Sequence, residues 1–321
     1  MTPHILHGNI ARFADERVNL HQDRVQKYRD QVNALRDRLA AKIADDPNFD
    51  LVKMVHSGSV AKGTALSTVN DMDVAVYVRK AAAPTDEEKL LRWLADKLRE
   101  ANPQMNPDQF SLGTHCVTVS FRGSGLDVDV VPVLYEGAHD DRGNLLNRET
   151  GEWLETSIPL HLKFIRSRKR IAPKHFSQVI RLLKWWAQLQ KTSRSGFRFK
   201  SFMIELLCAH LLDMRKRFDD YPLALQSFFA YVVQSSLNER IAFNDYYQPS
   251  KLPKADGAPI QIFDPVNPDN NVAGTYTDSE RKVIVEASYD ALDALSEAHH
   301  SDTKGRAVDL WKEVLGPSFG V

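Results

Sequence analysis

Two short apolar segments carry paired aspartates, and this pattern constrains the fold more than any other feature of the chain. Residues 71–78 read DMDVAVYV and residues 126–133 read LDVDVVPV, which is typical of buried β-strands. Successive side chains of a strand point to opposite faces, so Asp71 and Asp73 share one face. Asp127 and Asp129 share a face for the same reason. The chain is therefore expected to fold around a sheet that carries neighbouring carboxylates.

Carboxylates held this close repel one another, and the pKa of one of them rises unless a cation lies between them. Hard oxygen ligands of this kind favour Mg²⁺, which usually binds through one or two carboxylates together with the phosphates of a nucleotide. The first pair alone is equally typical of an exposed strand with alternating acids. Because a second pair occurs on a second apolar strand, we favour a two-metal site for phosphoryl or nucleotidyl transfer.

A turn of small residues precedes the first aspartate pair. Gly58 and Ser59 follow a predicted strand, where a glycine lets backbone amides approach a phosphate closely and a serine adds a hydroxyl donor. Gly58 and Gly63 have the spacing of a P-loop. Lys62, however, precedes the second glycine and Thr64 follows it directly, which is not the order of residues in a P-loop.

The periodicity of apolar residues predicts an α+β chain. We expect a long amphipathic helix with one break at 5–44, a helix at 85–101, and strands at 51–57, 71–78, 114–121 and 126–133. The second half is expected to be helical, at 160–170, 175–190, 201–217, 223–237 and 279–298, with one short strand at 260–263. These patterns predict a sheet domain over residues 1–157, including the N-terminal helix, packed on a helical domain over residues 158–321.

Composition excludes several classes of protein. No apolar run approaches the roughly 18–20 residues that cross a bilayer, and the N-terminal segment lacks the apolar centre of a signal peptide. We therefore expect a cytoplasmic protein with no membrane partner. The two cysteines, Cys116 and Cys208, provide neither a disulfide framework nor a four-cysteine zinc site. Cys208 lies in the apolar run FMIELLCAHLL, which predicts a buried helical residue.

The formal net charge is +0, yet charge is strongly segregated along the chain. Residues 160–217 contain fifteen Lys and Arg against two acids, Glu205 and Asp213. A segment of this kind either forms a solvated basic surface or faces a polyanion. The size of the imbalance favours the polyanionic ligand.

Taken together, these segments resemble the DNA polymerase β-like nucleotidyltransferases, and among them the 2'-5' oligoadenylate synthetases and the cyclic GMP-AMP synthase and DncV-like enzymes (CD-NTases). Residues 58–78, GSVAKGTALSTVNDMDVAVYV, are similar to the first motif of these enzymes, including its Lys-Gly-Thr part. Asp71 and Asp73 match its two carboxylates. LDVDVVPV is similar to the strand of the third carboxylate, where the acid precedes two residues and a proline. Asp129 is the match there, with Asp127 as its neighbour and alternative.

The resemblance implies nucleotide-binding residues in both halves of the chain. In the first motif these are Gly58, Ser59, Lys62 and Thr64. VIRLLKWWAQ is similar to the helix whose lysine grips the donor triphosphate, which implies Lys184. KSFMIELLCAHLL is similar to the next helix, where Ser201 would contact the phosphates and Phe202 would stack on a base. IFDPVNPDNNVAG is similar to the Asp-Pro loop near the nucleotide, which adds Asp264. The alternatives are core packing for Phe202 and a solvent-facing helix position for Lys184.

The same resemblance implies the reaction. Asp71, Asp73 and Asp129 would bind two Mg²⁺ ions, with Mn²⁺ as the alternative ion. The enzyme would join nucleoside triphosphates, ATP first among them, into a cyclic oligonucleotide and release pyrophosphate. In this family such a product is a second messenger of bacterial anti-phage (CBASS) signalling, and it reaches a downstream effector by diffusion.

Two further inferences limit this interpretation. The zinc-binding insertion of the animal cyclic GMP-AMP synthase is absent, and the near-neutral net charge leads us to expect no nucleic-acid activator. The same catalytic residues would also serve a template-independent enzyme that makes linear oligoadenylate or extends RNA. An inert nucleotide- or RNA-binding module on the same fold is an alternative of another class, which the intact set of acids disfavours.

Overall fold

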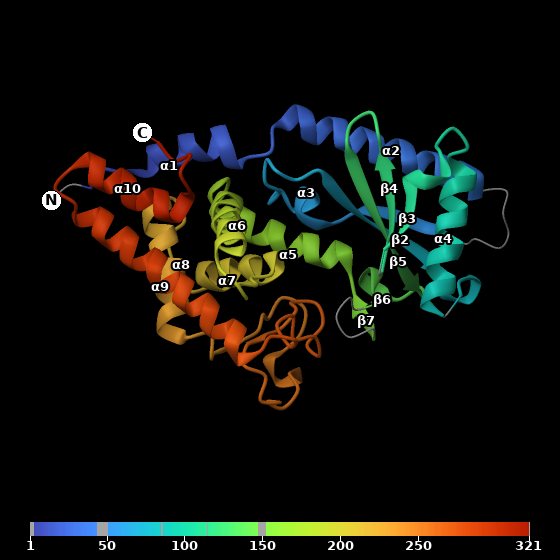
Figure 1. The fold of residues 1–321 in the computed structure, drawn as a ribbon. Coiled ribbons are helices and arrows are strands. Elements are labelled where there is room, and N and C mark those ends of the chain that lie inside the picture. The colour runs from blue at the N-terminus through green and yellow to red at the C-terminus, as the bar shows by residue number, and fades with distance from the viewer. Residues whose placement is uncertain (1–2, 44–50, 85, 114, 147–151, 321) are drawn as a thin grey trace. The chain divides into compact units, whose positions relative to one another are not determined.

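The computed structural model describes residues 3–43, 51–84, 86–113, 115–146 and 152–320. Figure 1 labels most of its elements. The helices are α1 (His7–Phe13), α2 (Gln22–Ile43), α3 (Gly58–Lys62), α4 (Glu87–Ala101), α5 (Ile158–Ile171), α6 (His175–Ser193), α7 (Ser201–Asp213), α8 (Tyr221–Ser235), α9 (Asp278–His300) and α10 (Lys304–Leu315). The strands are β1 (Leu51–His56), β2 (Asp71–Arg79), β3 (Phe110–Leu112), β4 (Val117–Phe121), β5 (Leu126–Tyr135), β6 (Gly143–Leu146), β7 (Trp153–Thr156), β8 (Arg240–Ile241) and β9 (Gln261–Ile262). A π-helical turn, η1 (Ala14–Val18), continues α1, and short 3-10 turns are η2 (Lys80–Ala82), η3 (Pro107–Gln109), η4 (His139–Asp141) and η5 (Pro249–Lys251).

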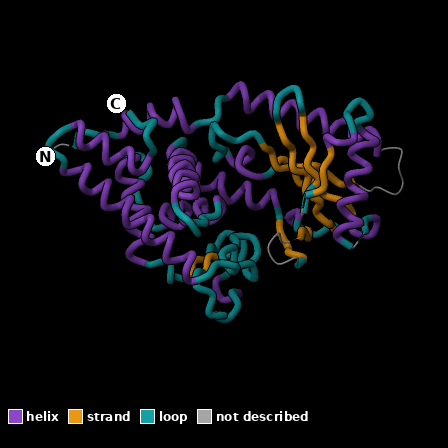
Figure 2. The backbone as a smooth tube through the Cα atoms, in the orientation of Figure 1, coloured by secondary structure: helices purple, strands orange, loops and turns teal. Residues whose placement is uncertain are grey.

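The chain divides into two compact units. The sheet unit is Leu20–Lys163, and the helical unit combines Met1–Asn19 with Phe164–Val321. The strands, orange in Figure 2, belong to the sheet unit apart from the short parallel pair β8–β9. Of the helices in the described ranges, none has a stretch both long and apolar enough to span a bilayer.

The sheet unit is built on seven strands. β1, β2, β5, β4 and β3 lie side by side in that order, while β6 pairs with both β5 and β7. β2 and β5 run parallel, and the other neighbouring strands are antiparallel. The parallel pair matters for function because β2 and β5 are the two strands that carry the paired aspartates.

The two faces of β2 have different surroundings. Val74 and Val76 are fully buried in the main core of the unit, together with residues of α2 and α4. The opposite face begins with Asp71 and Asp73 and continues with Tyr77, which is buried in a second, smaller cluster. Strand alternation thus sends the apolar residues toward the two helices and leaves the carboxylates on the other face.

The helical unit is organised around α6, which contacts α7, α8, α10 and η1. Its core is rich in aromatic rings: Trp186 of α6 packs edge-on against Phe197 and Phe229, with ring centroids 5.6 and 4.8 Å apart. Edge-to-face contacts of this kind stabilise a core beyond the area that they bury. Cys208 is fully buried on α7, as the sequence predicts.

The predicted α+β class and the N-terminal helix with one break are confirmed. The division into units differs from the predicted boundary between residues 157 and 158, because the helical unit begins at Phe164 and also includes Met1–Asn19. The physical reason lies in contacts to α6. Gln178 donates to the Asn19 side chain at 3.0 Å, Arg181 donates to it at 2.8 Å, and these bonds tie the start of the chain to the second half.

Candidate active site

Four carboxylates form an in-register array on the parallel strands β2 and β5, which we call the acid ladder: Asp71, Asp73, Asp127 and Asp129. The strand register places Asp71 opposite Asp127 and Asp73 opposite Asp129. Neighbouring strands lie about 4.8 Å apart, so each carboxylate has another beside it across the strands. The strand register therefore brings the four acids together on adjacent strands, as expected from the sequence.

Two hydroxyl groups of β4 orient the carboxylates of β5. Thr118 donates from Oγ1 to Oδ1 of Asp129 at 2.6 Å, and Ser120 donates from Oγ to Oδ1 of Asp127 at 2.6 Å. The antiparallel register makes each hydroxyl residue the direct neighbour of its aspartate. Neither residue was predicted from the sequence. The alternation of Thr118 and Ser120 in the strand VTVSF was the signal that could have indicated them.

Gly58, the first residue of α3, lies directly against Asp73. A Cβ atom at this position would be 1.8 Å from Oδ2 of Asp73, so any side chain here would displace the carboxylate. Gly58 also has φ +64, a conformation that glycine adopts at no steric cost. The backbone N–H of Ser57 donates to the Asp73 carbonyl oxygen at 2.8 Å, which fixes the turn to β2. A glycine is therefore required where the turn meets the acid ladder.

The rest of the small-residue turn is compact. Ser59 and Lys62 are half-buried on α3, and Gly63 ends that helix with φ +73. Thr64 is fully buried, and its backbone N–H donates to the Ser59 carbonyl oxygen at 2.8 Å. Thr64 thus closes the turn from inside, although the resemblance implied a nucleotide contact for it.

The donor set of the ladder suits a hard divalent cation, since all of its ligand atoms are carboxylate oxygens on one face. Over the described ranges, no three His, Cys, Asp or Glu side chains are already arranged to hold a metal ion. Like charges repel, and Thr118 and Ser120 hold the two β5 carboxylates toward β4. The residues fit Mg²⁺ or Mn²⁺, but a cation would have to draw the oxygen atoms together.

In the helical unit, Lys184 lies on α6 and is only 6% exposed. Its ammonium group forms an ion pair with Glu205 of α7, with 2.6 Å between Nζ and Oε1. The alternative of a solvent-facing position for Lys184 is therefore wrong. Glu205 is one of the two acids of the basic segment, and no role was predicted for it from the sequence. Its isolation in the apolar run FMIELLC was the available signal.

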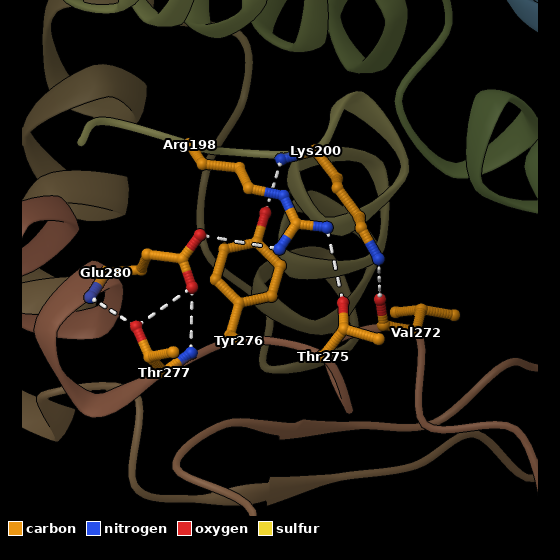
Figure 3. A network of polar contacts seen from close by, with 7 residues as sticks. All are labelled: Arg198, Lys200, Val272, Thr275, Tyr276, Thr277 and Glu280. Carbon is orange, nitrogen blue, oxygen red and sulfur yellow. Dashed lines mark hydrogen bonds and ion pairs between the residues drawn. The ribbon is translucent and has the colours of Figure 1, made fainter. Parts of the chain in front are cut away.

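Ser201 and Phe202 form the first turn of α7, where Ser201 is exposed and Phe202 is partly buried. A polar network holds the residues just before them (Figure 3). The Lys200 backbone N–H donates to the Tyr276 hydroxyl at 2.9 Å, and the Lys200 ammonium donates to the Val272 carbonyl oxygen at 2.8 Å. This network ties the start of α7 to the segment before α9.

Arg198 adds a second layer to the same network. Its guanidinium group lies over the Tyr276 ring, 4.5 Å from the centroid, and donates to Thr275 Oγ1 at 3.2 Å. Glu280 completes the network through a 3.5 Å ion pair with Arg198 (Figure 3). Arg198 and Tyr276 were not predicted as site residues, because no local pattern of the sequence indicates that these distant residues meet.

Asp264 is 3% exposed and is engaged within its own loop. Its Oδ1 accepts the Val266 backbone N–H at 2.8 Å, and its Oδ2 accepts a hydrogen bond from the Asn270 side chain at 3.1 Å. The Asp264 backbone N–H also donates to the Asn270 carbonyl oxygen at 2.9 Å. These bonds make Asp264 the organiser of the Asp-Pro loop.

Comparisons with known proteins show the family of the chain. Residues 6–168 match a family described as Second Messenger Oligonucleotide or Dinucleotide Synthetase domain. The chain is 53% identical over 318 residues to the cyclic AMP-AMP-AMP synthase of Escherichia coli strain MS 115-1, and the match covers 99% of both chains. It is 33% identical to the CBASS oligonucleotide cyclase CdnC of Escherichia coli strain KTE188, over 97% of this chain and 96% of that relative.

Solved structures show the same relationship. The structure of E. coli MS115-1 CdnC with ATP has a TM-score of 0.95 at 52% identity and covers 99% of this chain and 100% of that one. The complex of that CdnC with HORMA-deltaN gives 0.94 at 52% identity and covers 99% of each chain. The Vibrio cholerae DncV cyclic AMP-GMP synthase shares the fold, with a TM-score of 0.70 at 12% identity, over 100% of this chain and 98% of that one. The chain therefore belongs to the CD-NTase family of second-messenger oligonucleotide synthases.

Proposed function

We propose that this protein joins three molecules of ATP into cyclic AMP-AMP-AMP and releases pyrophosphate, as a second messenger of CBASS anti-phage signalling in the cytoplasm. The observation that carries this proposal is the acid ladder in a chain that matches a cyclic AMP-AMP-AMP synthase over 99% of both lengths. The structure of the relative with ATP supports ATP as the substrate. The diffusible product would act on a separate effector.

Each of the first two steps would form a bond between a ribose hydroxyl oxygen and the α-phosphorus of an ATP and break the bond from that phosphorus to pyrophosphate. Ring closure would repeat the same exchange at the 5'-triphosphate of the linear product, so that three pyrophosphates leave in all and each attacking hydroxyl gives up its proton. Asp71, Asp73 and Asp129 would hold two Mg²⁺ or Mn²⁺ ions, which neutralise phosphate charge and favour ionisation of the attacking hydroxyl. We prefer Asp129 to Asp127 as the third acid, because Asp129 lies opposite Asp73, the carboxylate that Gly58 touches. Thr118 keeps Asp129 oriented.

For the nucleotide itself, the family resemblance leads us to propose triphosphate contacts for Gly58 and Ser59 in the sheet unit and, separately, for Lys184 and Ser201 in the helical unit. Lysine is a compact point charge suited to phosphate. Phe202 would stack on a base, which needs an aromatic face and little hydrogen-bond selectivity. The half-buried Lys62 would add a positive charge to the turn.

We assign structural roles to two residues that the family resemblance placed at the nucleotide. Thr64 is fully buried behind the turn, and both Asp264 carboxylate oxygens accept hydrogen bonds inside the loop. Thr64 and Asp264 would each hold the backbone that borders the nucleotide, and neither side chain would contact the nucleotide.

The comparisons also supply a kind of partner that the sequence analysis did not predict. A relative 52% identical to this chain was solved in complex with HORMA-deltaN, and we propose that this chain likewise binds a HORMA-domain protein. The near-neutral net charge leads us to expect no nucleic-acid activator in addition, although the basic segment at 160–217 leaves that alternative open. Strict dependence of synthesis on added DNA or RNA would contradict this expectation.

The proposal is tested by incubating the protein with each labelled NTP and with all four, with Mg²⁺, alone and with the HORMA protein of the E. coli relative. We expect a phosphatase-resistant product from ATP with the mass of cyclic AMP-AMP-AMP, and no product from the D71N/D73N double variant. A phosphatase-sensitive product would identify a linear oligoadenylate synthase instead. Nucleotide binding without pyrophosphate release under every condition would identify an inert binding module.

A further inference from the structure

The ion pair between Lys184 and Glu205 joins two helices inside the helical unit. Lys184 of α6 is 6% exposed, Glu205 of α7 is 2% exposed, and their charged atoms are 2.6 Å apart. Glu205 follows Ser201 by four residues on α7, and residues at this spacing lie on the same helical face. The pair therefore places the Lys184 ammonium against the face of α7 that begins with Ser201.

Burial makes the partner of this lysine important. A buried lysine without a counter-charge loses its proton readily, because desolvation can lower the pKa of a fully buried lysine by up to about 3–5. A neighbouring carboxylate opposes that effect and favours the charged ammonium.

Cys208, one turn further along α7, is a titratable group whose pKa both members of the pair influence. Burial raises the pKa of the Cys208 thiol well above its ordinary value; Glu205 raises it further, and Lys184 opposes the shift. Cys208 is therefore a neutral thiol near neutral pH. It does not compete with Glu205 for the charge of Lys184.

We propose that Glu205 is a positioning residue for nucleotide binding, which holds the Lys184 ammonium charged and oriented beside the first turn of α7. This inference rests on the proposed role of Lys184 in binding the triphosphate. Glu205 itself would not touch the nucleotide. Its contribution would appear as the affinity of the protein for a triphosphate and as the dependence of that affinity on pH.

The test measures the Kd of the non-hydrolysable analogue α,β-methylene-ATP, with Mg²⁺, between pH 6.5 and 9. The proteins compared are the wild type, K184M, E205Q and E205D, after their thermal unfolding midpoints have been measured. The ratio of variant to wild-type Kd is the quantity of interest, because titration of the analogue itself cancels in it. D245N is the matched control, since Asp245 accepts a 2.8 Å hydrogen bond from Arg168, another buried cation of the helical unit.

In E205Q the pKa of Lys184 falls, so its charge is lost as the pH rises. We expect the Kd ratio of E205Q to grow from about twofold at pH 6.5 to about tenfold or more at pH 9. E205D keeps the carboxylate, so the Kd ratio of E205D to wild type should stay constant with pH. This variant can be measured even if E205Q does not fold. D245N should lower the unfolding midpoint without a pH-dependent Kd ratio.

The outcomes separate the two proposals. If K184M binds the analogue as tightly as the wild type, Lys184 does not bind the triphosphate, and the proposed role of Glu205, which rests on that of Lys184, fails as well. If K184M binds weakly while the Kd ratio of E205Q is constant with pH, the role of Lys184 stands and that of Glu205 is overturned. A ratio that varies with pH equally in E205D and E205Q would also overturn it, because the charge of residue 205 would then not matter.

Discussion

The acid ladder and the Lys184–Glu205 pair carry charge in opposite ways. The ladder sets like charges side by side on one face of β2 and β5, with Asp71 exposed and the other three carboxylates half-buried. The pair sets opposite charges in contact inside the helical unit. The ladder thus gathers negative charge that a bound cation would offset, whereas each charge of the pair already lies against an opposite charge.

The two regions should therefore respond differently to mutation, in both activity and stability. Like charges that repel contribute little to the stability of the fold, so neutralising one of the three proposed metal-binding carboxylates, Asp71, Asp73 or Asp129, should greatly slow the reaction and leave the protein folded. Removing one partner of a buried pair leaves an uncompensated charge, which is strongly destabilising. Mutations should therefore separate catalysis from stability in the sheet unit more cleanly than in the helical unit.

The largest effect is expected within the ladder itself, from D129N compared with D127N. Both changes keep the size of the side chain, and both residues accept a hydroxyl hydrogen bond of 2.6 Å. We expect D129N to lower the rate of pyrophosphate release by roughly a thousandfold or more and D127N by no more than about tenfold. Equal losses would show that the two acids act together and that the register position does not distinguish them.

A smaller but still large effect is expected from G58A. A methyl group at residue 58 would strain the backbone by about 1–2 kcal/mol and would push the Asp73 carboxylate away. A displacement of about 1 Å can lower a catalytic rate by about a hundredfold, which is the loss that we expect. G123A is the matched control, because a Cβ at Gly123 has nothing within 4 Å, and its rate should equal that of the wild type.

The smallest effect concerns the network at the start of α7. Y276F removes the hydroxyl that accepts the part-buried Lys200 backbone N–H at 2.9 Å, so this hydrogen bond is lost. We expect a loss of about 1 kcal/mol in the free energy of unfolding and about a threefold rise in the KM for ATP. Y289F, at a tyrosine that is 57% exposed, should change neither quantity. If Y276F left the KM for ATP unchanged, this network would not contribute to nucleotide binding.

The sequence predicted those features that depend on local periodicity. The strands with Asp71, Asp73 and Asp129 follow from apolar alternation, and the turn at Gly58 follows from its position after a strand. Short strands such as β6 and β7 escaped prediction, because pairing with neighbours, more than their own composition, makes them strands.

The sequence could not predict which distant side chains meet. Glu205 follows Lys184 by 21 positions, and only the packing of α6 on α7 brings them together. The boundary of the helical unit escaped prediction for the same reason, since Asn19 and Gln178 are 159 positions apart and meet through tertiary packing. Thr118 could be predicted in part: the sequence indicated its strand and the face that it occupies, but not that Asp129 is its neighbour across the strands.

The central claim is that the acid ladder performs the chemistry while Lys184 binds the triphosphate. The most direct test compares D129N with K184M, measuring both the maximal rate of pyrophosphate release from ATP and the Kd of α,β-methylene-ATP with Mg²⁺. D129N should lose about a thousandfold in rate with Kd within about threefold of the wild type. K184M should raise Kd by about 10–100-fold while its maximal rate at saturating ATP falls less than about tenfold. If both variants lost rate equally and bound the analogue equally well, the division of roles would be contradicted.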